Sequence, residues 1–168
     1  LFTTLDGIER KLNDSDLMIC DGNNPMCIAG VFGGDDYGIN NETNTIFLES
    51  AYFDPVSIRK TAKFHSINSD ASFRFERGID VELVEYALKR AALLICEECE
   101  GKICSDIIDE YSKRIDSKSI LLNYEKTNKL IGQIIPPEEI KSILTSLDFK
   151  INNITETGVG ITVPNYRH

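Results

Sequence analysis

The chain has 168 residues, of which 42% are hydrophobic, enough for one large core or for one medium and one small domain. It carries 27 acidic and 18 basic residues, a formal net charge of -9. This excess of carboxylates excludes nucleic-acid binding by bulk electrostatics, because phosphate contacts need Lys and Arg. The sequence has no signal peptide and no apolar run long enough for a membrane span, which predicts a cytoplasmic protein.

The charge is unevenly distributed along the chain. Residues 1–112 contain 21 acidic and 10 basic residues, whereas residues 113–168 contain 6 acidic and 8 basic residues. A break of this kind predicts two modules, 1–112 and 113–168. The chain starts without Met and stops just after an apolar strand pattern, so we expect the first module to be truncated at its N-terminus and the second at its C-terminus.

In the first module, a turn is predicted at Leu5-Asp6-Gly7, because Asp bonds the following backbone and Gly supplies a positive φ. Three short apolar runs have the pattern of β-strands, and a fourth strand is expected near the end of the module; these are residues 17–20, 26–32, 45–48 and 103–108. Asp54-Pro55 is typical of a helix start, and that helix would run to Phe64. A longer amphipathic helix is predicted from Asp80 to Glu100, ended by Gly101.

The second module has a simpler pattern. A strand is expected at 119–122, followed by a helix at 124–131 that ends at Gly132, and the Pro136–Glu139 segment opens another helix. That helix would direct four apolar side chains inward, namely Ile140, Ile143, Leu144 and Leu147. A hairpin of 149–151 and 159–163 closes the module. The whole pattern predicts a mixed α/β (α+β) fold: a mixed-sheet domain followed by a small α+β module.

The five cysteines are odd in number and irregularly spaced. Cys96-x-x-Cys99, with Cys104 nearby, invites a zinc interpretation, but there is no second CxxC pair and neither histidine lies close in sequence. Reduced, buried thiols with structural roles are the simpler interpretation, and no metal site is predicted.

Four motifs in the first module, in this order and spacing, resemble the central module of the bacterial phenylalanyl-tRNA synthetase β subunit. They are Leu5–Gly7, Ile28–Gly34, Leu48–Phe53 and Asp70–Asp80. In the second module, the pattern from Leu130-Ile131-Gly132 to Val163-Pro164 and Arg167 resembles the small module that follows in that subunit. The resemblance covers nearly the whole chain. The Arg-Phe-Glu-Arg-Gly string is specific when it occurs together with Ala-Gly-Val-Phe-Gly-Gly.

The resemblance implies a role in phenylalanine–tRNA ligase, in which the whole enzyme charges tRNA-Phe using ATP and Mg2+. It implies an α subunit and tRNA-Phe as partners, an α2β2 assembly, and no cofactor in this segment. It also implies an editing site that hydrolyses mischarged Tyr-tRNA-Phe. The family's pocket uses a His and an Arg from chain before Leu1, so the isolated segment is expected to be inactive.

The same resemblance assigns the substrate-binding residues. Glu49 matches the Glu that contacts the tyrosine hydroxyl, and Gly33 matches a position where a side chain would fill the pocket. Ser69 and Ala71 match two further pocket positions. Ser69 stands where the family commonly has Thr, and it is the candidate for positioning the ester or a water. No residue is assigned as a nucleophile or base.

Each assignment has a structural alternative. Glu49 could be a carboxylate paired with Arg59, Arg74 or Arg77, since buried carboxylates are normally paired. Gly33 could serve a plain tight turn, and Ser69 could be a helix cap. The segment as a whole could also be a non-catalytic structural or tRNA-docking part of the β subunit. A nucleic-acid-binding regulator is a third interpretation, against which the pI of 4.7 counts.

Two further expectations concern charged side chains in the first module. His65 is expected to be a surface residue without a chemical role. Arg74, Glu76, Arg77 and Asp80 are expected to form a salt-bridged network at a helix entrance.

Overall fold

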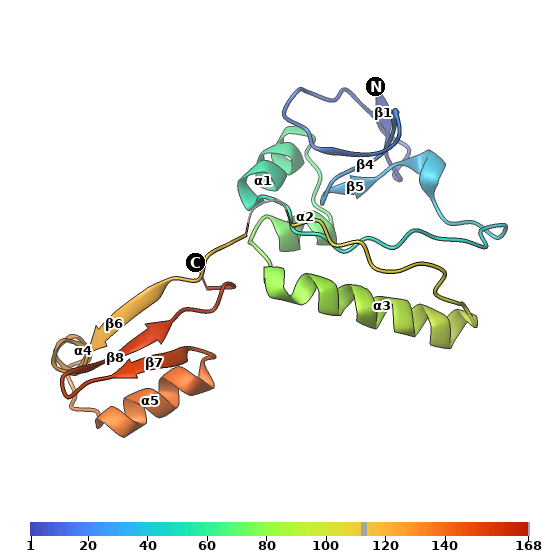
Figure 1. Cartoon of the computed structure of the whole chain (residues 1–168). Helices are drawn as coiled ribbons and strands as arrows, with labels where there is room; N and C mark the ends of the chain where they lie inside the picture. Colours follow the sequence, from blue (N-terminus) through green and yellow to red (C-terminus); the bar gives the residue numbers. More distant parts are fainter. Residues whose placement is uncertain (112–113, 168) are drawn as a thin grey trace. The chain divides into compact units, whose positions relative to one another are not determined.

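The computed structural model describes residues 1–111 and 114–167, which divide into two compact units (Figure 1). The first unit is Leu1–Asp106 and the second begins at Ile107. Each has its own apolar core. Helices and small antiparallel sheets occur in both, so the prediction of a mixed α/β fold is confirmed. No helix in the described ranges is both long and apolar enough to span a membrane.

The first unit contains two small antiparallel sheets. One pairs β1 (Phe2–Thr3) with β2 (Glu9–Arg10), and the other has the order β3 (Met18–Asp21), β4 (Asn24–Ile28), β5 (Phe32–Gly33). The β3–β4 ladder contains an irregularity between Ile19 and Cys20. An isolated bridge between Thr4 and Gly34 connects the end of the first sheet to the end of the second. The 3-10 turn η1 (Asp35–Tyr37) follows.

The first unit contains three α-helices and two 3-10 turns in its described residues. Besides η1, they are α1 (Pro55–Phe64), α2 (Asp70–Phe75), the 3-10 turn η2 (Val81–Leu83) and α3 (Val84–Cys99). Side-chain caps mark the starts of α1, α2 and η2 but not of α3. The predicted start of α1 is confirmed, because the Asp54 side chain accepts a hydrogen bond from the N–H of Ser57. Asp80 caps η2 in the same way, at the N–H of Glu82.

Two predicted strands are absent from the described residues. Residues 45–48 and 103–108 have β-type apolar patterns but no strand neighbour, and a strand is stable only when its backbone groups are paired. The end of α3 is also one residue earlier than predicted. Glu100 takes the left-handed conformation, with φ 53°, in place of Gly101.

The core of the first unit joins α1 to the β4–β5 turn. Phe2, Ile28, Val31, Ile58 and Ala62 are its buried members. Gly30 lies in the turn with φ +65°, and a Cβ added there would lie 2.7 Å from Phe53 Cδ2 and 2.9 Å from Ile58 Cδ1. Glycine is therefore required at this position both for the backbone conformation and for the approach of two core side chains.

Substitution of Gly30 by Ala is expected to destabilise the chain more than substitution of Gly22, which has φ +58° and open space around it. Either substitution is expected to lower the free energy of unfolding by about 1 to 2 kcal/mol, because Ala must adopt the left-handed backbone conformation. Gly30→Ala adds about 1 to 3 kcal/mol for overpacking against Phe53 and Ile58. Urea denaturation measures the free energy of unfolding; equal losses in the two variants would contradict the packing argument.

A buried polar cluster joins the loop before β3 to α1. The side chains of His65 and Asp16 are 4% and 0% exposed, and Asp16 Oδ2 lies 2.7 Å from His65 Nε2. Thr61 donates to the same carboxylate at 3.0 Å, and the backbone N–H of Asn13 at 2.9 Å. Burial acts to raise the pKa of Asp16, but hydrogen bonds from Asn13, His65 and Thr61 outweigh it and leave that pKa below its usual value. The expectation that His65 is a surface residue is wrong.

The second unit is a three-stranded antiparallel sheet with two helices. Its elements are β6 (Ser119–Asn123), α4 (Tyr124–Ile131), α5 (Pro137–Ser146), β7 (Lys150–Ile154) and β8 (Gly158–Thr162). The strand order is β6-β8-β7. The predicted stop at Gly132 is confirmed by its φ of 81°, and the predicted closing hairpin is β7–β8.

The core of this unit corrects one expectation about α5. Ile140 and Leu144 are buried with Tyr124, Val159 and Ile161. Ile143 and Leu147, also expected to face inward, are exposed. A short helix on a three-stranded sheet buries only a narrow stripe, and these two side chains lie outside it.

Candidate functional site

Glu49 lies in the irregular segment between η1 and α1, anchored by its neighbour Ser50, whose Oγ donates to the carbonyl of Val84 at 2.9 Å. Glu49 is exposed as a whole residue, yet partial burial of its carboxyl group raises its pKa. Within residues 1–111 and 114–167, no Lys or Arg forms an ion pair with Glu49. In the part of the chain that the structure describes, the Glu49 carboxylate is therefore not neutralised by a cationic side chain.

The alternative in which Glu49 pairs with an arginine finds no support in these contacts. Arg74 lies 3.5 Å from Asp70, and Arg77 lies 2.9 Å from Glu76. The expected network of four charged residues reduces to these local pairs, because Asp80 instead caps the backbone at η2. Arg77 also lies over the ring of Phe73, 3.6 Å from its centroid.

Gly33 lies at the end of β5, opposite Cys27 of β4. Its carbonyl accepts a hydrogen bond from the N–H of Leu5 at 3.0 Å. A Cβ added to Gly33 would lie 2.8 Å from Leu5 Cδ1, so Leu5 occupies the space that a side chain at Gly33 would take. The glycine thus permits close approach of the Leu5 turn.

Ser69 and Ala71 lie at the start of α2. Ser69 is the N-cap: its Oγ accepts from the N–H of Ser72 at 3.0 Å and donates to the carbonyl of Val31 at 2.5 Å. The structural alternative for Ser69, a helix cap, is therefore present in the fold. Ala71 is half-buried in the first turn of the helix. The Ser69–Val31 bond holds this end of α2 next to the β4–β5 turn.

Two of the predicted residues, Gly33 and Ser69, contact the β4–β5 hairpin. Burial is the main cause that raises the pKa of the Cys27 thiol, and the nearby negative charge of Glu49 raises it further. Cys27 pairs with Gly33, which lies two residues after Val31, and the carbonyl of Val31 accepts a hydrogen bond from Ser69 Oγ. Gly33 and Ser69 thus both contact the β4–β5 hairpin, and the charge of Glu49 acts on Cys27 of the same hairpin.

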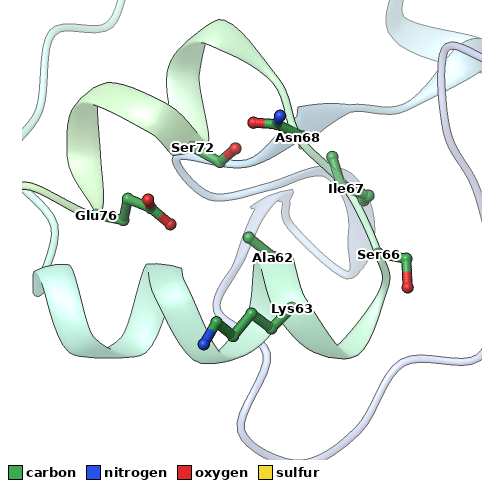
Figure 2. Close-up of a pocket in the computed structure, with 7 residues that line it drawn as sticks. All are labelled: Ala62, Lys63, Ser66, Ile67, Asn68, Ser72 and Glu76. Carbon is green, nitrogen blue, oxygen red and sulfur yellow. The ribbon is translucent and has the colours of Figure 1, made fainter.

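A separate cavity of about 360 Å³ is lined by α1, α2 and the loop between them (Figure 2). Its lining residues are Ala62, Lys63, Ser66, Ile67, Asn68, Ser72 and Glu76. None of the four predicted site residues lines it, although Asn68 immediately precedes Ser69 in sequence. The hydroxyl of Ser72 donates a hydrogen bond to the backbone carbonyl of Ser69 at 3.0 Å.

The turn at Leu5-Asp6-Gly7, predicted from its sequence, carries an ion pair that was not predicted. The carboxylate of Asp6 accepts from Arg10 Nη1 and Nη2 at 2.8 and 2.9 Å. It also accepts from Thr4 Oγ1 at 2.6 Å. Hydrogen bonds from Arg10, and then from Thr4, hold the pKa of Asp6 well below its usual range. The spacing of Asp6 and Arg10, four residues apart around a glycine turn, is the sequence signal that could have indicated this pair.

The five cysteines are free thiols in the structure. Among the residues that the structure describes, no group of three or more His, Cys, Asp or Glu side chains is arranged to hold a metal ion. Cys20, Cys99 and Cys104 are exposed, so the interpretation of the cysteines as buried structural thiols is wrong for these three.

Comparison with known protein families assigns both units. The B3/4 domain model matches residues 1–100, and the tRNA synthetase B5 domain model matches residues 120–168. The chain therefore belongs to the B3/4 domain family, with a B5 domain following.

The curated relatives are β subunits of phenylalanine–tRNA ligase. The chain is 53% identical, over 99% of its length, to the subunit from Bacteroides fragilis strain YCH46. It is 48% identical over 99% of its length to that from Porphyromonas gingivalis, and 42% identical over 98% to that from Fusobacterium nucleatum. It spans about a fifth of the length of these relatives, 20%, 20% and 21% respectively. The predicted resemblance to this subunit family is confirmed.

Proposed function

We propose that the chain is part of a phenylalanine–tRNA ligase β subunit and supplies residues to a site that hydrolyses Tyr-tRNA-Phe. The observation that supports this most directly is the state of Glu49. Among the described residues its carboxylate has no cationic partner, and it lies within electrostatic reach of Cys27, opposite Gly33. A carboxylate in this state is an acceptor for the phenolic hydroxyl of tyrosine.

The chemistry explains why such a site is useful. An apolar pocket that binds phenylalanine discriminates weakly against an analogue that adds one hydroxyl, so a second, hydrolytic site is needed. A site that hydrogen-bonds the hydroxyl favours the tyrosyl ester, because the phenylalanyl ester would leave Glu49 without its partner. Phe-tRNA-Phe would then be spared.

In this proposal, hydrolysis depends on orientation of the ester and of a water molecule, since no nucleophile with an adjacent base is present among the predicted residues. Ser69 keeps an oxygen near the β4–β5 turn, and Ala71 leaves room beside it. The ester and water would approach this end of the site. The whole enzyme would add the α subunit, tRNA-Phe, ATP and Mg2+, in an α2β2 assembly.

The test is deacylation by the assembled synthetase that contains this chain. Tyr-tRNA-Phe and Phe-tRNA-Phe are incubated separately with the enzyme, without ATP, and the remaining ester is followed over time. We expect rapid loss of the tyrosyl ester and slow loss of the phenylalanyl ester. If both esters decay at the rate without enzyme, the segment has a structural or tRNA-docking role and the proposal is wrong.

A further inference from the structure

The open face of the sheet in the second unit contains a glycine that the fold itself does not require. β8 is the central strand of this sheet, between β6 and β7 (Figure 1). Val159 and Ile161 of β8 belong to the apolar core, together with residues of α4 and α5. Because successive side chains of a strand point to opposite faces, Gly158, Gly160 and Thr162 lie on the face directed away from these helices.

The two glycines of β8 differ in what a side chain would meet. A Cβ added to Gly158 would lie 2.4 Å from the backbone carbonyl oxygen of Leu122, so the fold requires glycine there. A Cβ added to Gly160 would have its nearest neighbour, Asn153 Cβ, at 3.5 Å, which is an ordinary van der Waals contact. The φ of Gly160 also lies outside the left-handed region. The strand could therefore accommodate a side chain at residue 160.

Glycine inside a strand weakens the strand, so its presence at Gly160 needs a reason. The usual reasons are a bulge, a tight bend, or the close approach of a ligand or of another backbone. The irregularity of this sheet lies in β7, between Ile151 and Asn153, and β8 itself is paired at each position on its β6 side. Close approach of another group to the open face is the reason that remains.

The side chains around Gly160 indicate what kind of group approaches. Leu121 of β6 and Asn153 of β7 lie directly opposite Gly160 on either side. Leu121 is 72% exposed, and Asn153 is exposed as well. In the part of the sheet that the structure describes, the open face carries one charged residue, Lys150, in the next row. The face is thus nearly uncharged and partly apolar.

This composition favours a polypeptide over a nucleic acid. Docking of an RNA backbone needs several Lys or Arg side chains, and this face offers one. An exposed leucine suits an apolar side chain, and a carboxamide can both donate to and accept from the N–H and C=O groups of a peptide backbone. Polypeptide of this kind is at hand, because the chain spans only 20% of the length of the Bacteroides fragilis subunit.

We propose that the open face of β6-β8-β7 binds a polypeptide segment of the β subunit from outside this chain, and that Gly160 lets the backbone of that segment lie directly on β8. Leu121 packs against an apolar side chain of the segment, and Asn153 hydrogen-bonds its backbone. The inference is independent of the editing function, because the predicted site residues all lie in the first unit.

The first experiment compares thiol labelling at residue 121 in the 168-residue chain and in the assembled synthetase that contains it. Leu121→Cys is introduced, and its reaction with N-ethylmaleimide is followed by mass spectrometry of the peptide that carries it. A docked face that is open less than about a tenth of the time should react at least about tenfold more slowly in the synthetase. Glu156→Cys is the control, since Glu156 is exposed in the turn between β7 and β8 and should react equally in both.

The second experiment tests the role of Gly160. In the 168-residue chain, Gly160→Val should leave the urea midpoint of unfolding unchanged or raise it, because a Cβ has room and valine favours strands. Gly158→Ala should lower that midpoint. In the synthetase, Gly160→Val should block the approach of the segment, so the thiol at residue 121 should react as fast as in the 168-residue chain. Gly160→Ala, with a smaller side chain, should give an intermediate rate.

Three results would overturn the inference. Equal labelling of residue 121 in the 168-residue chain and in the synthetase would mean that nothing covers the face. Protection that appears only after tRNA-Phe is added would assign the face to RNA instead of polypeptide. Protection that persists in the Gly160→Val synthetase, with the urea midpoint of the 168-residue variant unchanged, would show that no backbone lies on β8 at this residue.

Discussion

Replacement of Glu49 by Ala in the assembled synthetase is expected to slow hydrolysis of Tyr-tRNA-Phe by roughly 10- to 150-fold, the effect of losing one hydrogen bond to a charged group. Hydrolysis of Phe-tRNA-Phe should change little, because phenylalanine has no hydroxyl to offer the carboxylate. The variant should therefore lose its preference between the two esters. Single-turnover deacylation of each ester gives the two rate constants.

Two further variants control for charge and for position. Glu49→Gln keeps the size and an acceptor oxygen but loses the negative charge, so its preference should lie between those of the parent and Glu49→Ala. Glu42→Ala removes an exposed carboxylate from the same irregular segment and should leave both rates unchanged. Equal preference in the parent and Glu49→Ala enzymes would make Glu49 part of the scaffold.

Replacement of Asp16 by Ala is expected to destabilise the chain by about 3 kcal/mol, because it leaves several buried donors without an acceptor. Those donors are His65, Thr61 and the backbone N–H of Asn13. Asp14→Ala, which removes an exposed carboxylate two residues away, should cost little. Urea denaturation at neutral pH measures the free energy of unfolding of both variants. Leaving a buried donor unsatisfied costs at least about 1 kcal/mol. A smaller loss for Asp16→Ala would therefore show that these donors find other acceptors.

The same carboxylate gives the chain a pH dependence. The pKa of Asp16 is lower in the folded chain than its ordinary value of 3.8, so its contribution is complete above that value. It is lost as the pH falls through the lower, folded-state pKa. The difference in unfolding free energy between the parent and Asp16→Ala should thus be constant near neutrality and shrink at acidic pH. A difference that grew on acidification would have the wrong sign.

Local chemistry allowed much of the fold to be predicted. Asp54-Pro55 marked the start of α1 and Gly132 the end of α4, because capping depends on residues next to one another in sequence. Residues 45–48 and 103–108 failed as strands for the opposite reason. Strand formation needs a partner that is distant in sequence, and an apolar pattern does not show whether one is present.

In the candidate site, too, sequence neighbours were predictable and contacts between residues distant in sequence were not. Glu49, Gly33, Ser69 and Ala71 were assigned through resemblance, and the structure adds the pairing of Gly33 with Cys27 and the hydrogen bond from Ser69 to Val31. The partners of these residues were not predictable from local pattern. His65 contacts Asp16 across 49 positions, so an isolated histidine gave no sign that it was buried.

A crystal structure of the assembled synthetase with L-tyrosine bound in this chain, compared with crystals soaked in L-phenylalanine, tests the role of Glu49 most directly. We expect the phenolic oxygen about 2.5 to 3.0 Å from a carboxylate oxygen of Glu49, with the ring beside Gly33. Phenylalanine should bind there weakly or not at all. Tyrosine found in this unit away from Glu49, or Glu49 paired with an arginine while tyrosine is bound, would contradict the proposed recognition of the hydroxyl.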